Sequence, residues 1–336
     1  MFSVRTSTGR DTRITRVRSS VLDLPLPDDF RPAWGRNEIQ RSFFTTIVQV
    51  ETESGITGIS AAEAGPESAI SIDRFVAPHL IGQDAAAPEP LTGVLKDSEI
   101  VGAPVYCVEI ALWDIAGKVA GLPVRKALGR SSRQAACVLR HRRGAIGGAA
   151  NRGPSTDHGG GLQGGQAAVH SDDPRQDVWV VETLRAEVGD RLAILVDANQ
   201  AGVLPGLGGH RQWNFHVALE VGLEEPLPRH DYAGLRRLRD RLGTLQLAGG
   251  ENNRLAASVP NHSWFEFRHE PPGWPASALS QMLVKKHSIH ADGCLAVPDR
   301  PELGFDLDEE LIERYTVARR LTRPLTRARS KTYGEA

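Results

Sequence analysis

Cysteine is scarce in this chain of 336 residues. Its three cysteines, Cys107, Cys137 and Cys294, are widely separated, and no Cys-x-x-Cys pair occurs. Because an odd, scattered set supports neither a disulfide framework nor a zinc knuckle, we expect a protein of the reducing cytoplasm.

Long apolar runs and an excess of one charge are also missing. The sequence contains no stretch of about 18 apolar residues, so we expect no membrane span. Its N-terminal region has several arginines but lacks the apolar centre of a secretory signal. The formal net charge of −1 provides no basic footprint for nucleic acid. We therefore predict a small-molecule partner, with no nucleic acid and no membrane.

The composition is that of a globular protein, with 40% hydrophobic and 24% charged residues, and the length suits two domains. The first part of the chain predicts a small α+β domain, because runs of Val, Ile, Thr and Phe precede a long amphipathic pattern. The expected elements are strands over 14–24 and 42–51, a hairpin partner over 56–61, and a helix over 104–120 that ends at Gly121 and Pro123.

From about Asp173, helix and strand patterns alternate at the period of a βαβ unit, which is about 30 residues. This rhythm predicts parallel strands, in either a barrel or an open sheet. The expected elements are a helix over 178–188, a strand over 192–196, a helix over 213–220, a strand ending at Glu224, a helix over 232–242 and a strand over 245–248. Near the C-terminus, residues 306–320 predict a helix with Asp306 and Glu309 as a capping box.

Three acidic residues stand at the ends of three successive predicted strands: Asp197, Glu224 and Glu251, each 27 residues after the one before. Successive strands of a parallel α/β barrel place their carboxyl ends on one face. Three carboxylates there repel one another unless a cation neutralises them, and hard oxygen ligands suit Mg²⁺. The alternative is three ordinary loop carboxylates, but the equal spacing favours a metal site.

Long motifs around these positions resemble the mandelate racemase/muconate lactonizing branch of the enolase superfamily. Residues 103–118, APVYCVEIALWDIAGK, resemble the first signature of that family, and LPV and LG within 122–129 continue the resemblance. The second resembles VDANQ at 196–200 together with EEP at 224–226, and the third ligand strand resembles GEN at 250–252.

This resemblance implies an α/β fold with an α+β capping domain and a modified (β/α)7β barrel of the TIM type. We accordingly expect a capping domain over 1–130, a barrel domain over 131–300, and a segment over 301–336 that returns to the capping domain and ends in a frayed tail. We expect this barrel to be incomplete.

The resemblance also implies chemistry. Asp197, Glu224 and Glu251 would bind Mg²⁺. Asn199 would contact a small carboxylate substrate or support the metal ligands, and Trp34 would contact that substrate or pack on its own domain. The implied reaction is removal of the proton alpha to that carboxylate, which leads to dehydration or racemisation of a sugar acid or hydroxy acid. If the chain folds, we expect it to form a homo-oligomer.

Two stretches depart from the family pattern. The family carries a Lys-x-Lys or Lys-x-Arg on the strand before the first ligand, yet no lysine lies between Lys126 and Lys285. Instead, residues 144–165 include nine glycines, a linker-like composition where two barrel strands belong. Because codons for this region can encode a lysine-containing strand when shifted by one base, we hypothesise a frameshifted stretch over about 135–170.

The second departure follows Glu251. A complete barrel of this type needs about 250 residues, whereas about 170 lie between Gly129 and Arg300. We infer an internal deletion near residue 253, which removes the strand that carries the family's catalytic histidine. The catalytic bases are therefore unknown, and the alternative function is an inactive remnant that binds Mg²⁺ or oligomerises.

Other motifs are weaker evidence of function. The sequence of residues 159–164 matches Gly-x-Gly-x-x-Gly but follows no predicted strand and opens no predicted helix, so it fails the context of a dinucleotide site. A different α/β enzyme on an open sheet would need a phosphate-binding helix N-terminus, and the sequence offers none.

Overall fold

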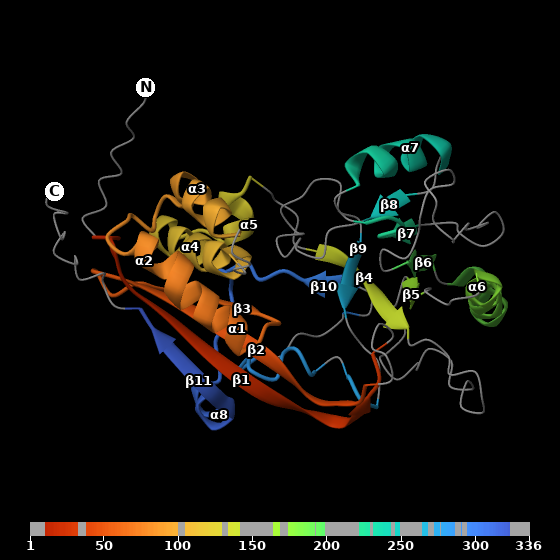
Figure 1. The fold of residues 1–336 in the computed structure, drawn as a ribbon, viewed down its shortest axis with the longest axis horizontal. Coiled ribbons are helices and arrows are strands. Elements are labelled where there is room, and N and C mark those ends of the chain that lie inside the picture. Colours follow the sequence, from red (N-terminus) through yellow and green to blue (C-terminus); the bar gives the residue numbers. More distant parts are fainter. Residues whose placement is uncertain are drawn as a thin grey trace, which may run out of the picture.

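The structure is a computed structural model, and fifteen parts of the chain are described by it. They are residues 11–32, 38–99, 105–129, 134–141, 164–168, 174–191, 193–198, 222–228, 231–242, 246–248, 264–267, 272–275, 277–285, 290 and 294–322. Two β-sheets organise these residues and lie side by side (Figure 1). Within them, no helix combines the length and apolar character needed to cross a bilayer.

The first sheet is antiparallel and has the strand order β11-β1-β2-β3. Its strands are β1 (Ile14–Phe30), β2 (Gln40–Thr52), β3 (Thr57–Ala62) and β11 (Thr316–Leu321). The three strands expected from the N-terminal sequence are thus confirmed, and β1 extends further than expected. Both ends of the described chain contribute to this sheet, because β11 pairs with β1.

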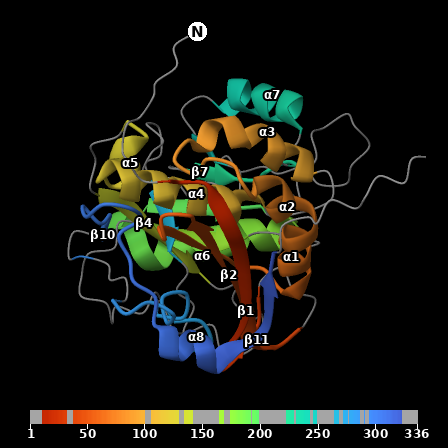
Figure 2. The ribbon, with the colours of Figure 1, turned by 90° about the vertical axis from the view of Figure 1, so that its left-hand side faces the viewer.

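Helices cover one face of this sheet (Figure 2). They are α1 (Pro66–Ser71), the π-helical turn η1 (Ile72–Val76), α2 (Ala77–Leu80), α3 (Pro88–Glu99), α4 (Val105–Ala120) and α5 (Val124–Ala127). The expected apolar stripe of α4 is confirmed, because Val108, Leu112 and Ile115 are fully buried in the same cluster as Val48 and Val50 of β2.

The opposite face packs against later parts of the chain. Leu22, Leu24 and Phe43 form a second cluster with Trp274 and Met282. Burying large apolar side chains on both faces stabilises the fold by about 1.5–3 kcal/mol for each fully buried residue. The sheet is therefore a central layer between two cores.

Gly58 sets how closely β3 approaches α4. A Cβ atom built at this position would overlap the carbonyl oxygen of Ala111 and lie 2.7 Å from Cγ1 of Ile115. We therefore expect Gly58→Ala to lower the free energy of unfolding by about 1–3 kcal/mol through overpacking. Gly93→Ala in α3 is the matched control: a Cβ there meets nothing within 4 Å, and the helix gains about 0.5–1 kcal/mol. Urea unfolding of both variants checks this, and equal effects would contradict the packing argument.

The second sheet is mainly parallel. Its strands are β4 (Gln134–His141), β5 (Gly164–Ala168), β6 (Ala193–Asp197), β7 (Gly222–Glu224), β8 (Gln246–Ala248), β9 (Trp264–Phe267) and β10 (Cys294–Ala296). Parallel pairing runs in the order β9-β4-β5-β6-β7-β8, while β10 is antiparallel to β4. Among the described residues, no ladder joins β8 to β9.

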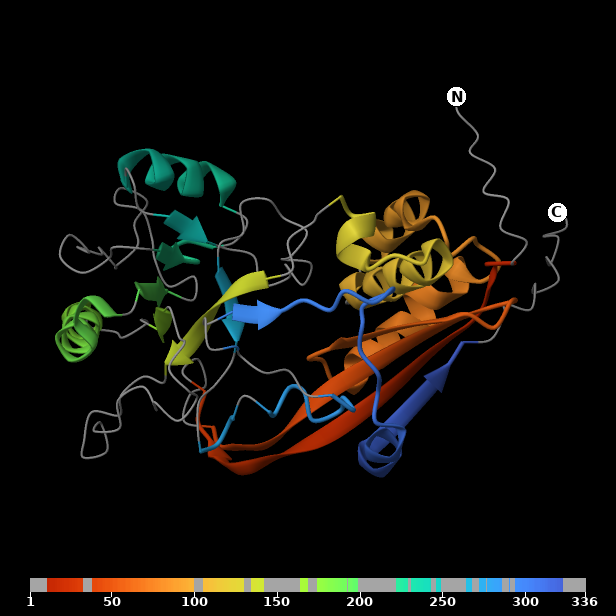
Figure 3. The same ribbon diagram turned by 180° about the vertical axis from the view of Figure 1, so that it is seen from behind.

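Two helices accompany this sheet. They are α6 (Pro174–Val188), followed by the 3-10 turn η2 (Gly189–Arg191), and α7 (Tyr232–Leu242). Val181, Leu184 and Val188 give α6 its buried side, and α6 lies on the side away from the antiparallel sheet (Figure 3). The alternation of helix and parallel strand is therefore confirmed, whereas the helix expected over 213–220 lies outside the described residues.

The helix expected over 306–320 is wrong in its extent. A short helix, α8 (Glu309–Tyr315), gives way to strand β11. The capping residue is Asp308, whose carboxylate accepts a hydrogen bond from the backbone N–H of Leu311 at 3.0 Å, and not Asp306. Pairing with the outer edge of β1, where Ala318 faces Val21, overrides the local helical pattern.

The linker-like interpretation of the glycine-rich region also needs correction. Strands β4 and β5 both fall within residues 134–168, and β5 starts at two of the nine glycines. A strand needs only backbone N–H and C=O groups to pair, so glycine weakens β5 without excluding it. The residues between β4 and β5, and the inferred deletion near residue 253, lie outside the described residues.

Candidate metal centre

Two carboxylate residues end neighbouring parallel strands. In the register of β6 and β7, Asp197 lies directly opposite Glu224. The backbone N–H of Ala198 donates to the carbonyl oxygen of Glu224 at 3.0 Å, which ties the two strand ends together. Neighbouring strands lie about 4.8 Å apart, so the two residues share one edge of the sheet.

Burial increases the cost of placing these two charges together. Asp197 is only 2% exposed, Glu224 is half-buried, and Ile194 and Val196 anchor β6 in the core. Two carboxylates in a low-dielectric setting repel each other unless a cation offsets their charge. Mg²⁺ is commonly held by one or two carboxylates, with water or substrate completing its octahedron. The donor set and its burial therefore fit Mg²⁺.

The chain turns sharply just after this pair. Glu225 has a φ of 37°, a left-handed conformation that residues other than glycine rarely adopt. Its side chain is buried, and Pro226 follows it. Such backbone strain is concentrated at functional sites. Glu225 is not among the site residues predicted from the sequence, because a residue before proline is expected to be extended and not left-handed.

The other predicted site residues cannot be placed beside this pair. Glu251, Asn199 and Trp34 all lie outside the described residues. In the described ranges, His, Cys, Asp and Glu side chains form no group of three or more that could hold a metal ion. The described part of the candidate site is thus the pair Asp197 and Glu224.

Strand β5 occupies the position next to the first carboxylate strand, with Ala168 opposite Asp197. This is where the family resemblance implies basic side chains. Its sequence is Gly-Gly-Gln-Ala-Ala, which contains no ionisable residue. The strand therefore provides no proton acceptor, and general-base catalysis needs a group from elsewhere.

Models of two protein families match the chain. The mandelate racemase / muconate lactonizing enzyme N-terminal domain matches residues 35–129. The enolase C-terminal domain-like family matches residues 158–254, which include all three predicted carboxylates.

Among curated proteins, the chain is 25% identical over 279 residues to L-talarate/galactarate dehydratase from Salmonella typhimurium, covering 74% of this chain and 66% of that protein. It is 30% identical over 245 residues to a D-galactonate dehydratase family member from Streptomyces sp. (strain SPB074), covering 61% of this chain and 55% of that protein. The chain spans between about a quarter and two thirds of the length of the curated relatives that it matches.

Solved structures show the same fold. An enolase from alpha proteobacterium bal199 with bound Mg superposes with a TM-score of 0.68 at 19% identity, covering 91% of this chain and 99% of that chain. L-talarate dehydratase from Polaromonas sp. JS666, complexed with Mg and L-glucarate, superposes with a TM-score of 0.63 at 23% identity. The match covers 92% of this chain and 99% of that chain. These likenesses indicate a capping domain and a TIM-type barrel.

Proposed function

Since this chain belongs to the mandelate racemase/muconate lactonizing enzyme family, we propose that it binds Mg²⁺ and removes the proton alpha to a carboxylate of a sugar acid or hydroxy acid. Asp197 and Glu224 are the proposed metal ligands, and Glu251 is the third. The observation that carries this proposal is the pairing of two carboxylates at adjacent parallel strand ends, one of them almost fully buried.

The residues of the chain have separate tasks in this proposal. Mg²⁺, when bound, stabilises the negative charge that develops on the substrate carboxylate. Burial of Asp197 and the backbone bond from Ala198 to Glu224 hold the ligands in place before substrate arrives. Asn199 and Trp34 are proposed to contact the substrate. Dehydration is favoured over racemisation, because the curated relatives named above are dehydratases or members of a dehydratase family.

The proposal extends to the architecture. The parallel series β9-β4-β5-β6-β7-β8 is proposed to be an incomplete form of the barrel, with domains over 1–130 and 131–300 and a returning segment over 301–336. The parallel register of β4 with β9, in which Ala136 faces Trp264, supports this arrangement. A frameshifted stretch over about 135–170, a deletion near residue 253 and a homo-oligomeric assembly remain part of the proposal.

A second candidate function is an inactive protein that still binds Mg²⁺. The sequence of β5 favours it, because this strand lacks any ionisable residue beside the first metal ligand. Loss of general-base help lowers the rate of proton removal by about 10²–10⁴-fold.

Deuterium incorporation distinguishes the two candidates. The full chain is incubated in D₂O with a panel of aldaric, aldonic and short hydroxy acids, in Mg²⁺ or in EDTA, and each acid is followed by proton NMR. Mg²⁺-dependent exchange of the alpha proton, or loss of water from one acid, supports the enzyme. Mg²⁺ binding without exchange supports the inactive protein, and exchange that is equally fast in EDTA would sink the metal-assisted reaction.

A further inference from the structure

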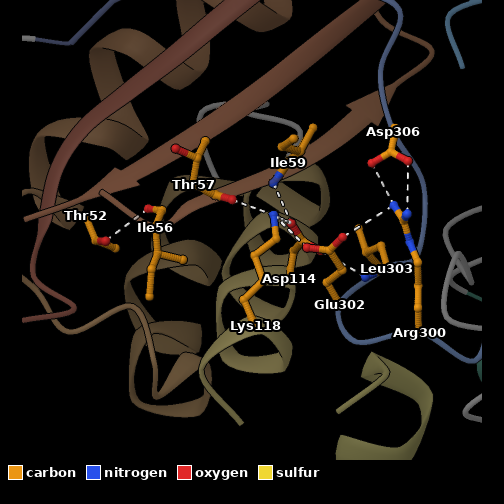
Figure 4. A network of polar contacts seen from close by, with 10 residues as sticks. All are labelled: Thr52, Ile56, Thr57, Ile59, Asp114, Lys118, Arg300, Glu302, Leu303 and Asp306. Carbon is orange, nitrogen blue, oxygen red and sulfur yellow. Dashed lines mark hydrogen bonds and ion pairs between the residues drawn. The ribbon is translucent and has the colours of Figure 1, made fainter. Parts of the chain in front are cut away.

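A second group of charges lies far along the chain from the candidate metal centre. Residues 299–306, here called the strap, connect β10 to the region of α8 and run along the end of α4 (Figure 4). The strap pairs with the turn between α4 and α5: the N–H of Glu302 donates to the carbonyl of Leu122 at 3.0 Å, and the N–H of Val124 donates to the carbonyl of Glu302 at 3.1 Å. Backbone pairing thus brings Glu302 against α4.

Asp114 of α4 joins three segments. Asp114 is only 3% exposed. One carboxylate oxygen accepts from the N–H of Ile59 in β3 at 3.0 Å, and the other accepts from the N–H of Leu303 in the strap at 2.9 Å. Hydrogen bonds from two backbone N–H groups stabilise this buried carboxylate, and a neighbouring cation adds to that stabilisation.

Lys118 supplies that cation one turn further along α4. Its Nζ lies 2.8 Å from Asp114 Oδ2 and 3.1 Å from Glu302 Oε2, and it donates to the carbonyl of Thr57 at 2.6 Å. The ammonium group thus contacts oxygen atoms from three residues, two by hydrogen bonds and Glu302 by an ion pair. The side chain is 23% exposed, so water screens the group only partly.

The remaining charges of the strap are arranged differently. Asp299 is held by two cations, Arg125 and Lys126. Arg300 mainly binds Asp306 through two hydrogen bonds of 2.9 Å and 2.8 Å, which hold the pKa of that carboxyl below its usual value. Arg300 also lies 3.5 Å from Glu302. Lys118 instead sits between carboxylates from two different segments.

We propose that the strap is a conformational device whose closed position depends on the positive charge of Lys118. Without that charge, Asp114 and Glu302 face each other as like charges across the contact, and the strap opens while the antiparallel sheet stays folded. Because the strap follows β10 after two residues, and β10 pairs with β4, opening of the strap also loosens a connection between the two sheets.

Hydrogen exchange of the full chain tests this device. Lys118→Met should raise the exchange rate of backbone amides in residues 299–306 by about tenfold or more, while amides that pair β1 with β2 keep their wild-type rates. Lys126→Met is the matched control, because Arg125 still holds Asp299 in its absence. Exchange in the strap should change by less than about twofold in this control.

A double variant separates charge from packing. Lys118→Met combined with Glu302→Gln lacks the same lysine contacts but leaves only one carboxylate, so strap protection should recover most of its wild-type value. This variant also reports on the device if the single variant does not fold. Three results would overturn the proposal. The strap amides of Lys118→Met could exchange at the wild-type rate, or the exchange rate could rise equally in β1 and β2. The strap of the double variant could also be no better protected than that of the single variant.

Discussion

Replacing Asp197 by asparagine is expected to abolish the stabilisation that Mg²⁺ gives to the folded chain. A ligand that binds only the folded state raises the free energy of unfolding by about 2.7 kcal/mol when its concentration is about 100 times its Kd. Asparagine keeps the shape of Asp197 but lacks the negative charge that attracts the ion. Urea unfolding in Mg²⁺ and in EDTA measures the difference for each protein.

The control for this prediction is Asp190→Asn. Asp190 is an exposed residue of η2, before the start of β6, so the same chemical change occurs there away from the carboxyl ends of β6 and β7. This variant should keep the full wild-type gain in Mg²⁺. If Asp197→Asn also keeps it, the ion binds elsewhere or does not bind the folded chain at all.

Removal of the Trp274 indole is expected to lower the free energy of unfolding by about 3–5 kcal/mol. Trp274 is 2% exposed, and its ring centroid lies 5.3 Å from that of Phe30 and 4.6 Å from that of Phe43. Alanine would leave a cavity between the antiparallel sheet and the segment that covers it. Thermal or urea unfolding of Trp274→Ala provides the measurement.

Trp179→Ala is the matched control, because Trp179 on α6 is 56% exposed. Its loss should change the free energy of unfolding by no more than about 0.5 kcal/mol. Similar costs for the two tryptophans would contradict the view that the second core holds the sheet and the later chain together.

The sequence predicted the strands and helices whose own residues determine their structure. Runs of Val, Ile, Thr and Phe located β1 and β2, the hairpin partner located β3, and the helical period gave both ends of α7. The short strands β4, β5, β9 and β10 were not expected, because pairing with distant strands defines them more than their own residues do. The same reason explains β11, which lies in sequence that resembles a helix but completes the edge of β1.

The candidate site shows the same division. The proximity of Asp197 and Glu224 follows from equal spacing along a βαβ rhythm, which sequence displays directly. The left-handed turn at Glu225 does not follow from any spacing. Outside the candidate site, the contact between Asp114 and Leu303 is equally hidden from the sequence, because it joins residues 189 positions apart. Such contacts depend on how the elements assemble, and no periodic pattern encodes them.

We propose that one Mg²⁺ ion binds at the adjacent ends of β6 and β7. The most direct test is a calorimetric titration of Mg²⁺ into the full, EDTA-treated chain, alongside Glu224→Gln and Asp190→Asn. We expect one site per chain in the wild type and in Asp190→Asn, and loss of most of that binding in Glu224→Gln. Equal binding in all three proteins, or no saturable binding in the wild type, would contradict a Mg²⁺ site at these strand ends.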